Sequence, residues 1–143
     1  MRIISWNING INAHYVALKT LVRKYNPDIL CLQKLKCTKG IEPFPIQGYE
    51  QFDISTYRSQ YYGVATYYRD IDFPLMNFPD ELAAEGHLQA LNLHEYNVQL
   101  FNVYAPFSNP KGDFIEARKY WDNLLQLHIS NSLYSPIILC GDL

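Results

Sequence analysis

Apolar residues along the chain form short runs of the length of β-strands, interrupted by two stretches with helical spacing. Residues 29–32 form an unbroken apolar run after a Pro-Asp turn, which is typical of a strand buried on both faces. In 13–25 the apolar side chains recur at helical spacing and predict a helix that covers a sheet. A strand at 2–7 precedes it, so the three segments predict a right-handed β-α-β unit with parallel strands.

Four further strands are expected from β-branched and aromatic content. They span residues 49–54, 63–69, 87–94 and 98–104. The last two are predicted to form a hairpin that turns at Glu95-Tyr96-Asn97. Residues 70–85 contain two prolines and several acids and predict an irregular segment.

A long helix followed by a final strand completes the pattern. Asp113, with Glu116 three positions later, resembles a capping box and predicts the start of the helix. Its buried side is expected to comprise Phe114, Ala117, Trp121, Leu124, Leu125 and His128. The last strand is predicted at 137–140. The alternation of strands and helices predicts an α/β fold with a mixed sheet and covering helices.

Polar side chains stand at the ends of several predicted strands. They are Asn7, Asn9, Lys34, Lys36, Tyr104 and Asp142. Ligands of open α/β sheets gather outside the carboxyl ends of the strands, so these residues are candidates for one site. Each also has a structural explanation, because lysines are usually solvated and asparagines in turns usually bond the local backbone.

Length, charge and cysteine content limit the classes of protein to which this chain can belong. The 143 residues suffice for one domain or part of one, and 48% hydrophobic residues can build a core. A formal net charge of −2 excludes a surface that is basic all round, so a nucleic-acid partner would be held by a local groove. Three cysteines without metal-like spacing favour a reducing compartment, and no apolar run reaches membrane-spanning length. We expect a cytoplasmic protein without membrane contact.

Six short motifs resemble a known family in their order and spacing. They are residues 6–10 (Trp-Asn-Ile-Asn-Gly), 27–36, 63–65 (Gly-Val-Ala), 85–86 (Glu-Gly), 102–106 (Asn-Val-Tyr-Ala-Pro) and 139–142 (Leu-Cys-Gly-Asp). They are similar to the successive motifs of the endonuclease/exonuclease/phosphatase superfamily, especially its exonuclease III type abasic-site (AP) endonuclease branch. The resemblance implies that residues 1–143 form the N-terminal half of a DNase I-like, four-layer α-β-β-α sandwich.

The resemblance also implies a phosphodiesterase that depends on Mg²⁺ or Mn²⁺ and acts on double-stranded DNA with abasic or 3′-blocked sites. Asn7 would help to hold the metal ion and orient the catalytic groups, with Asn9 and Lys36 binding the substrate beside it. Tyr104 would donate to the scissile phosphate or steer it as a tyrosinate, and Asp142 would orient or deprotonate the attacking water. A divalent cation suits such chemistry because it neutralises the phosphate oxygens.

One departure from the family concerns its principal metal ligand. The family motif Leu-Gln-Glu-Thr-Lys is replaced here by Leu-Gln-Lys-Leu-Lys at 32–36, so Lys34 stands where the family has a glutamate. A fixed ammonium about 4 Å from a divalent ion costs on the order of 8 kcal/mol at an effective dielectric constant near 20. Metal affinity is therefore expected to be weakened, whereas an ammonium can still pair with a phosphate.

A second departure concerns length. In the family an asparagine follows the Gly-Asp motif, and roughly as much chain again supplies an aspartate-histidine pair. His87 and His94 lie in the predicted hairpin and are expected to be strand residues instead. Without the second half, the apolar faces of strands 29–32 and 137–140 are expected to lack cover, which predicts self-association or a complementary chain.

Three functions remain open at this point. The chain is a fragment or impaired variant of the repair nuclease, a catalytically dead pseudo-nuclease that binds DNA or a protein partner, or a phosphodiesterase of another branch that acts on phosphoinositide, sphingomyelin or RNA-type substrates.

Overall fold

The computed structural model describes residues 1–37, 44–55, 63–70, 82, 86–108, 114–131 and 136–143. Its elements are β1 (Ile3–Asn7), α1 (Ile11–Tyr25), β2 (Ile29–Gln33), β3 (Glu50–Ser55), β4 (Val64–Tyr68), β5 (Leu88–Leu93), η2 (His94–Tyr96), β6 (Val98–Tyr104), α3 (Ile115–Asn131) and β7 (Ile137–Asp142). Asp113, Glu85 and most of the expected irregular segment 70–85 lie outside the described residues.

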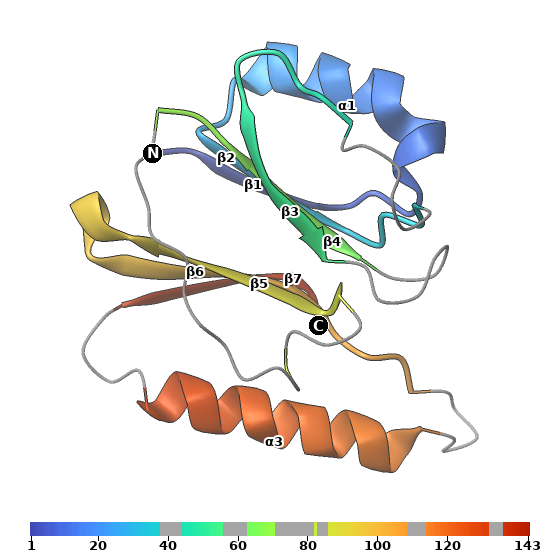
Figure 1. The fold of residues 1–143 in the computed structure, drawn as a ribbon, viewed down its shortest axis with the longest axis vertical. Helices are drawn as coiled ribbons and strands as arrows, with labels where there is room; N and C mark the ends of the chain where they lie inside the picture. Colours follow the sequence, from blue (N-terminus) through green and yellow to red (C-terminus); the bar gives the residue numbers. More distant parts are fainter. Residues whose placement is uncertain (38–43, 56–62, 71–81, 83–85, 109–113, 132–135) are drawn as a thin grey trace.

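Two sheets pack face to face between two helices, giving four layers (Figure 1). Sheet A has the strand order β1-β2-β4-β3, and sheet B has the order β5-β6-β7. Helix α1 covers the outer face of sheet A, and α3 covers the outer face of sheet B. The α-β-β-α sandwich with mixed sheets, expected from the sequence, is confirmed. None of the described helices is both long and apolar enough to cross a membrane.

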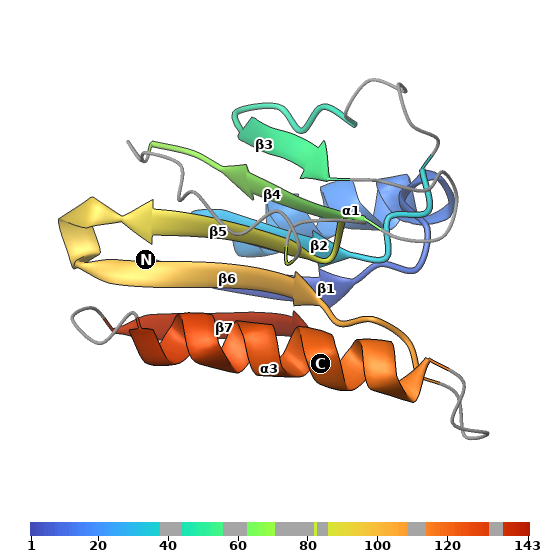
Figure 2. The ribbon, with the colours of Figure 1, turned by 60° about the horizontal axis from the view of Figure 1, so that its bottom comes forward.

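Each sheet contains one β-α-β unit. In sheet A, β1 and β2 are parallel, with the pairs running from Ile3 and Ile29 to Asn7 and Gln33. In sheet B, β6 and β7 are parallel in the same way. The carboxyl ends of these four strands point to the same side of the molecule (Figure 2). Two sheets therefore deliver their strand ends to one edge of the sandwich.

Strand β2 is the best-buried strand of the fold. Leu30 and Leu32 pack among the side chains beneath α1, whereas Ile29 and Cys31 pack between the sheets. All five residues of β2 are buried. The unbroken apolar run thus reflects a strand covered on both faces, as the sequence predicted. The expectation that 29–32 lacks cover is wrong, because sheet B supplies the second cover.

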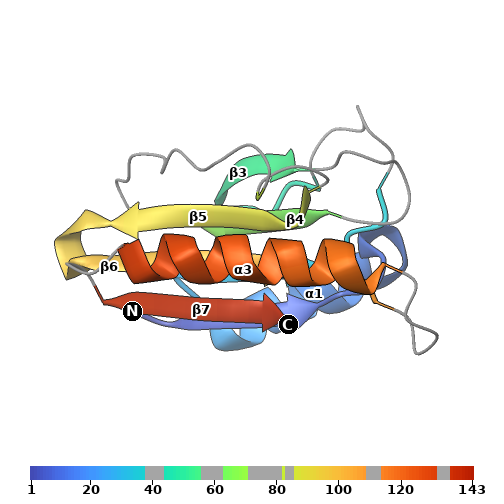
Figure 3. The ribbon, with the colours of Figure 1, turned by 90° about the horizontal axis from the view of Figure 1, so that it is seen from below.

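Of the two strands expected to lack cover, only β7 is partly exposed. This strand is an edge of sheet B, next to the edge strand β1 of sheet A (Figure 3). Leu139 is 38% exposed, and Ile137, Ile138 and Cys140 are half-buried. The expectation of incomplete cover therefore applies to β7 alone.

Helix α3 follows its predicted pattern only in the middle. Trp121 and Leu125 are buried against the strands of sheet B. Phe114 is 68% exposed and Ala117 is exposed, so their predicted burial is wrong. Phe114 lies before the helix start with a left-handed φ of 66°, which takes it out of the helical register on which the prediction depended.

Candidate functional site

The segments that follow β1 and β2 are joined by backbone hydrogen bonds. The amide of Gly10 donates to the carbonyl of Lys34 at 2.9 Å, and Ile11 donates to Leu35 at 2.9 Å. Asn9, Lys34 and Lys36 all have left-handed φ values, of 48°, 57° and 50°. Such conformations are uncommon for residues other than glycine and cluster at functional sites. The hydrogen bonds between the two turns therefore fix the backbone position of Lys34.

The ends of β6 and β7 are held together just as closely. Tyr104 and Asp142 are direct partners in the parallel register. The amide of Ala105 donates to the carbonyl of Asp142 at 2.9 Å. A Cβ at Gly141, whose φ is 141°, would lie 1.9 Å from the carbonyl oxygen of Val103. Only glycine therefore lets β7 approach β6 at this point, and the approach places the Asp142 carboxylate beside Tyr104.

A hydrogen bond between Asn7 and Asp142 connects the two sheets at this edge. The Nδ2 of Asn7 donates to the Oδ2 of Asp142 at 2.6 Å. The Oδ1 of Asn7 accepts from the backbone amide of Asn9 at 3.2 Å. The Asn9 amide thus selects the orientation of the Asn7 side chain, which presents its donor to the carboxylate.

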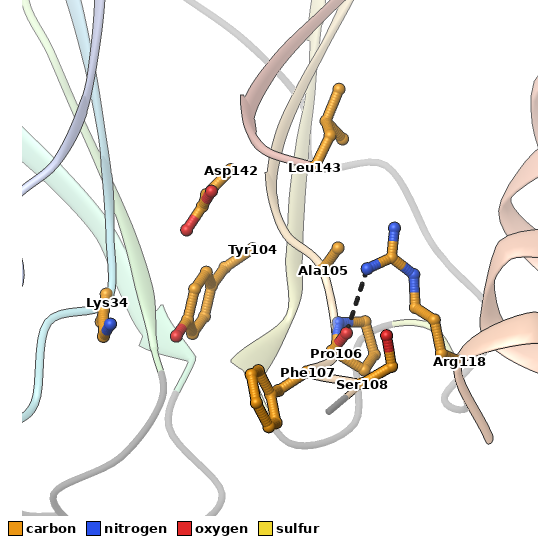
Figure 4. A pocket seen from close by; sticks show the side chains of 9 residues that line it. All are labelled: Lys34, Tyr104, Ala105, Pro106, Phe107, Ser108, Arg118, Asp142 and Leu143. Carbon is orange, nitrogen blue, oxygen red and sulfur yellow. Dashed lines mark hydrogen bonds between the residues drawn. The ribbon is translucent and has the colours of Figure 1, made fainter. Parts of the chain in front are cut away.

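Asp142 borders a small open pocket of about 230 Å³ (Figure 4), and Asn7 is connected to this pocket through its bond to Asp142. Its lining consists of Lys34, Tyr104, Ala105, Pro106, Phe107, Ser108, Arg118, Asp142 and Leu143. Drug-sized ligands occupy cavities of roughly 300–1,000 Å³. The pocket is smaller than these cavities.

The charges of the pocket are mixed. Lys34 is half-buried and makes no ion pair with any described residue, whereas the Asp142 carboxylate is exposed. The guanidinium of Arg118 is already engaged, with Nε 2.8 Å from the Asp122 carboxylate and Nη1 donating to the carbonyl of Pro106 at 3.1 Å. Of the two cationic side chains that line the pocket, Lys34 is therefore the more available to pair with a bound anion.

A buried polar network lies behind the pocket. The Nε2 of Gln33 donates to the Oδ1 of Asn102 at 2.8 Å and to the Oγ of Ser5 at 3.0 Å. The Nδ2 of Asn102 donates to the Oγ1 of Thr66 at 3.1 Å, and Thr66 donates to the Oε1 of Gln89 at 2.9 Å. The network therefore links strands of both sheets that carry site residues at their ends.

Two thiols meet in the same interior. Cys31 of β2 and Cys140 of β7 share a hydrogen bond across the sheets. Donation from Cys31 lowers the pKa of the Cys140 thiol, and the same bond together with burial raises the pKa of Cys31. The contact shows how closely the two sheets approach beneath Asp142.

The described residues do not form a metal centre. None of them gather three His, Cys, Asp or Glu side chains within reach of one ion. The pocket offers one carboxylate, already bonded to Asn7, and the ammonium of Lys34. Mg²⁺ requires an oxygen-rich ligand set at short distances. These side chains do not fit a tightly held Mg²⁺ or Mn²⁺.

The structure brings together four of the six candidate residues: Lys34, Tyr104 and Asp142 line the pocket, and Asn7 bonds to Asp142. Asn9 reaches the site through its bond to Asn7, and Lys36 is exposed with its Cδ 3.9 Å from a Cβ built on Gly10; neither lines the pocket. The roles assigned to these residues stay predictions, because proximity does not establish chemistry.

The sequence did not single out Phe107, Ser108 and Arg118 as pocket residues. Phe107 and Ser108 follow directly after the Tyr104-Ala-Pro strand end, a position that could have indicated them. Arg118 lies one helical turn before the buried Trp121, and this spacing is the sequence feature that could have placed Arg118 near the sheet. His87 and His94, expected to be strand residues, both lie just outside β5. His87 precedes it and is buried, with its Nδ1 2.6 Å from the carbonyl oxygen of Tyr104, and His94 begins η2.

Known proteins resemble this chain along its length. Residues 4–143 match the sequence model of the Endonuclease/Exonuclease/phosphatase family. An exodeoxyribonuclease of Bacillus subtilis is 28% identical over 149 aligned positions, which cover 100% of this chain and 58% of that protein. A DNA-(apurinic or apyrimidinic site) endonuclease 2 of Xenopus laevis is 42% identical over 78 positions, covering 52% of this chain and 15% of that protein.

A solved structure gives the same picture of the fold. The crystal structure of the catalytic domain of Xenopus laevis APE2 superposes with a TM-score of 0.80 at 26% identity. The match covers 99% of this chain and 58% of that chain. The chain thus spans a little over half the length of this domain and of the bacterial relative.

Proposed function

The chain belongs to the endonuclease/exonuclease/phosphatase family, and from this premise we propose that its strand-end pocket binds a phosphodiester of double-stranded DNA at an abasic or 3′-blocked site. The observation that carries the proposal is the Asn7–Asp142 hydrogen bond across the two sheets, at a pocket that also presents Tyr104 and Lys34. The names of the relatives, an exodeoxyribonuclease and an AP endonuclease, support DNA as the substrate class.

Each side chain has a role that its position supports. The Tyr104 hydroxyl donates to a non-bridging phosphate oxygen. The Asp142 carboxylate accepts a proton from, or orients, the attacking water, while the amide of Asn7 holds that carboxylate in place. The Lys34 ammonium pairs with the phosphate charge from the side of sheet A. Asn9 and Lys36 contact the neighbouring backbone of the substrate.

A divalent cation, when bound, would neutralise charge on the phosphate and the leaving oxygen. The described donors do not fit such an ion tightly, so we assign no step of the reaction to it. We propose that Mg²⁺ or Mn²⁺ binds only weakly here, because Lys34 places a positive charge at the pocket. Catalysis is then impaired in this chain relative to its relatives.

Lys34 also favours a second function, that of a DNA-binding module that cleaves poorly or not at all. A lysine beside the pocket repels a metal ion but attracts the phosphate itself. Affinity for DNA therefore survives the change that weakens metal binding. The two proposals share one binding site and differ in whether a bond is broken.

A duplex with one tetrahydrofuran abasic site tests both proposals. Binding is measured by fluorescence anisotropy against the matched intact duplex, and nicking is measured with Mg²⁺ and with a chelator. We expect tighter binding to the abasic duplex, with Mg²⁺-dependent nicking that is slow or absent. Equal, weak binding to both duplexes would overturn the proposal. Cleavage of an RNA or phosphoinositide phosphodiester instead of DNA would assign the chain to another branch.

The exposed edge of the sandwich supports a protein contact as well. Leu139 is 38% exposed on β7, and β7 lies beside the edge strand β1. Unpaired strand edges with apolar side chains invite pairing with further strands. We propose that a complementary chain or a second copy covers this edge, which native mass spectrometry would detect.

The described cysteines form no disulfide, which supports the reducing, cytoplasmic location that we propose.

A further inference from the structure

Phe107 is an exposed aromatic residue on the wall of the pocket. Its side chain is 62% exposed, three positions after Tyr104, and its ring stands at the mouth that Lys34 and Tyr104 also border (Figure 4). Leaving a phenyl ring in water forgoes roughly 25 cal/mol per Å² of apolar surface. Nothing among the described residues covers it, and the roles assigned above to the pocket do not use it.

The size of the pocket limits which part of a DNA strand it can hold. At about 230 Å³, the pocket is smaller than the roughly 300–1,000 Å³ cavities that hold drug-sized ligands. If a phosphate with its sugar occupies this space, the neighbouring nucleobase lies at the rim. The rim beside Tyr104 is formed by Pro106 and Phe107, which are an apolar surface and not a hydrogen-bonding one.

We propose that Phe107 stacks on the nucleobase that flanks the bound phosphodiester, and so contributes to the recognition of abasic DNA. This inference rests on the function proposed above and names a residue that determines its specificity. Beside an abasic position the flanking base has lost one stacking neighbour, and a phenyl ring replaces that neighbour. In an intact duplex the same base is stacked on both sides and offers Phe107 no face.

Exposure alone does not distinguish Phe107, because Tyr120 on α3 is 60% exposed. Tyr120 is absent from the pocket lining, whereas Phe107 belongs to it. The two residues thus form a matched pair: both are exposed aromatic side chains, and one lies at the candidate site. Substitution of Tyr120 controls for a general loss of aromatic surface.

The test uses the tetrahydrofuran duplex with 2-aminopurine, whose fluorescence is quenched by stacking, as the base next to the abasic position. Aromatic stacking on a base is worth about 1–3 kcal/mol by alanine substitution, so Phe107→Ala is expected to weaken binding to this duplex at least about fivefold. Phe107→Trp should retain affinity and quenching, and Tyr120→Ala should change neither. The intact duplex should show no difference among the variants.

Two outcomes separate this inference from the function on which it rests. If the unmodified protein prefers the abasic duplex and Phe107→Ala binds it within twofold, with unchanged quenching, the stacking role is overturned and the proposed function stands. If the unmodified protein shows no preference for the abasic duplex, both are overturned together. Loss of affinity in Tyr120→Ala equal to that in Phe107→Ala would also overturn the stacking role.

Discussion

The side chains of Asn7 and Asp142 meet at 2.6 Å although they are 135 positions apart in the sequence and belong to different sheets. Asn7 ends β1 and Asp142 ends β7, so the bond joins the carboxyl ends of two strands that belong to different β-α-β units. The pocket with Tyr104 and Lys34 lies directly beside it. The site is therefore a consequence of the way in which the two sheets face each other.

Asp142→Asn is expected to raise the affinity for DNA by up to about fivefold, because one exposed charge pair is worth at most about 1 kcal/mol. The substitution removes a negative charge that faces the phosphate, and the new amide oxygen can still accept from Asn7. Lys34→Gln should lower affinity by a similar factor. Both effects should shrink as salt rises. Changes of the same sign in the two variants, measured by anisotropy, would contradict the assigned charges.

Asn102→Leu is expected to lower the free energy of unfolding by about 2–4 kcal/mol, because it leaves buried partners without hydrogen bonds. Asn102 serves Gln33 and Thr66 at once, and all three are buried. Urea denaturation measures the change. Asn123→Ala, at an exposed position of α3, is the control and should shift stability by less than about 0.5 kcal/mol. Equal effects at the two asparagines would exclude a structural role for the network.

Gly141→Ala is expected to destabilise the protein by about 3 kcal/mol or more, since the added Cβ overlaps the backbone of Val103. Gly48 provides the comparison: its φ is 82° and a Cβ there meets no atom within 4 Å, so Gly48→Ala should cost only about 1 kcal/mol of backbone strain. Thermal unfolding of both variants measures the difference. A Gly141→Ala variant as stable as Gly48→Ala would mean that β7 does not pack on β6 in this way.

Asp28 makes a stability contribution that depends on pH. The backbone amide of Arg2 donates to its carboxylate at 2.5 Å, and this bond, with help from Arg69 and the N-terminus, holds the pKa of Asp28 below its usual value against the effect of burial. A lowered folded-state pKa means that the contribution is full above the unfolded pKa of about 3.9 and disappears as pH falls through the folded value.

Asp28→Asn should therefore cost stability at about pH 6, by no more than about 1 kcal/mol because the carboxylate is partly exposed to solvent, and should cost nothing at about pH 2. Urea titrations of the two proteins at several pH values give the difference. A larger cost at the acidic end would reverse the sign and contradict the lowered pKa of Asp28.

Local pattern predicted the elements well because their apolar periodicity is strong. The boundaries of β6 were predicted to the residue, and the parallel pairing of β1 and β2 followed from the intervening helix. The convergence of Asn7, Lys34, Tyr104 and Asp142 was predictable because parallel strands present their carboxyl ends at one edge.

Contacts between the sheets were not predictable from local pattern. Gln33, Thr66, Gln89 and Asn102 stand out as polar residues within buried strands, but their pairing depends on how sheet B is set against sheet A. The same arrangement covers 29–32, which the sequence alone led us to expect open. Exposure of Phe114 depends on one left-handed φ just before α3, for which the periodicity gave no sign.

The central claim is that Lys34 occupies the place of a metal ligand at a phosphodiester site, and the Mg²⁺ affinity of Lys34→Glu tests it most directly. Isothermal titration calorimetry compares this variant with the unmodified protein and with Lys36→Glu, which makes the same charge change outside the pocket lining. We expect at least tenfold tighter Mg²⁺ binding, about 1.4 kcal/mol or more, for Lys34→Glu alone. Affinities that are equal in Lys34→Glu and the unmodified protein would contradict the account.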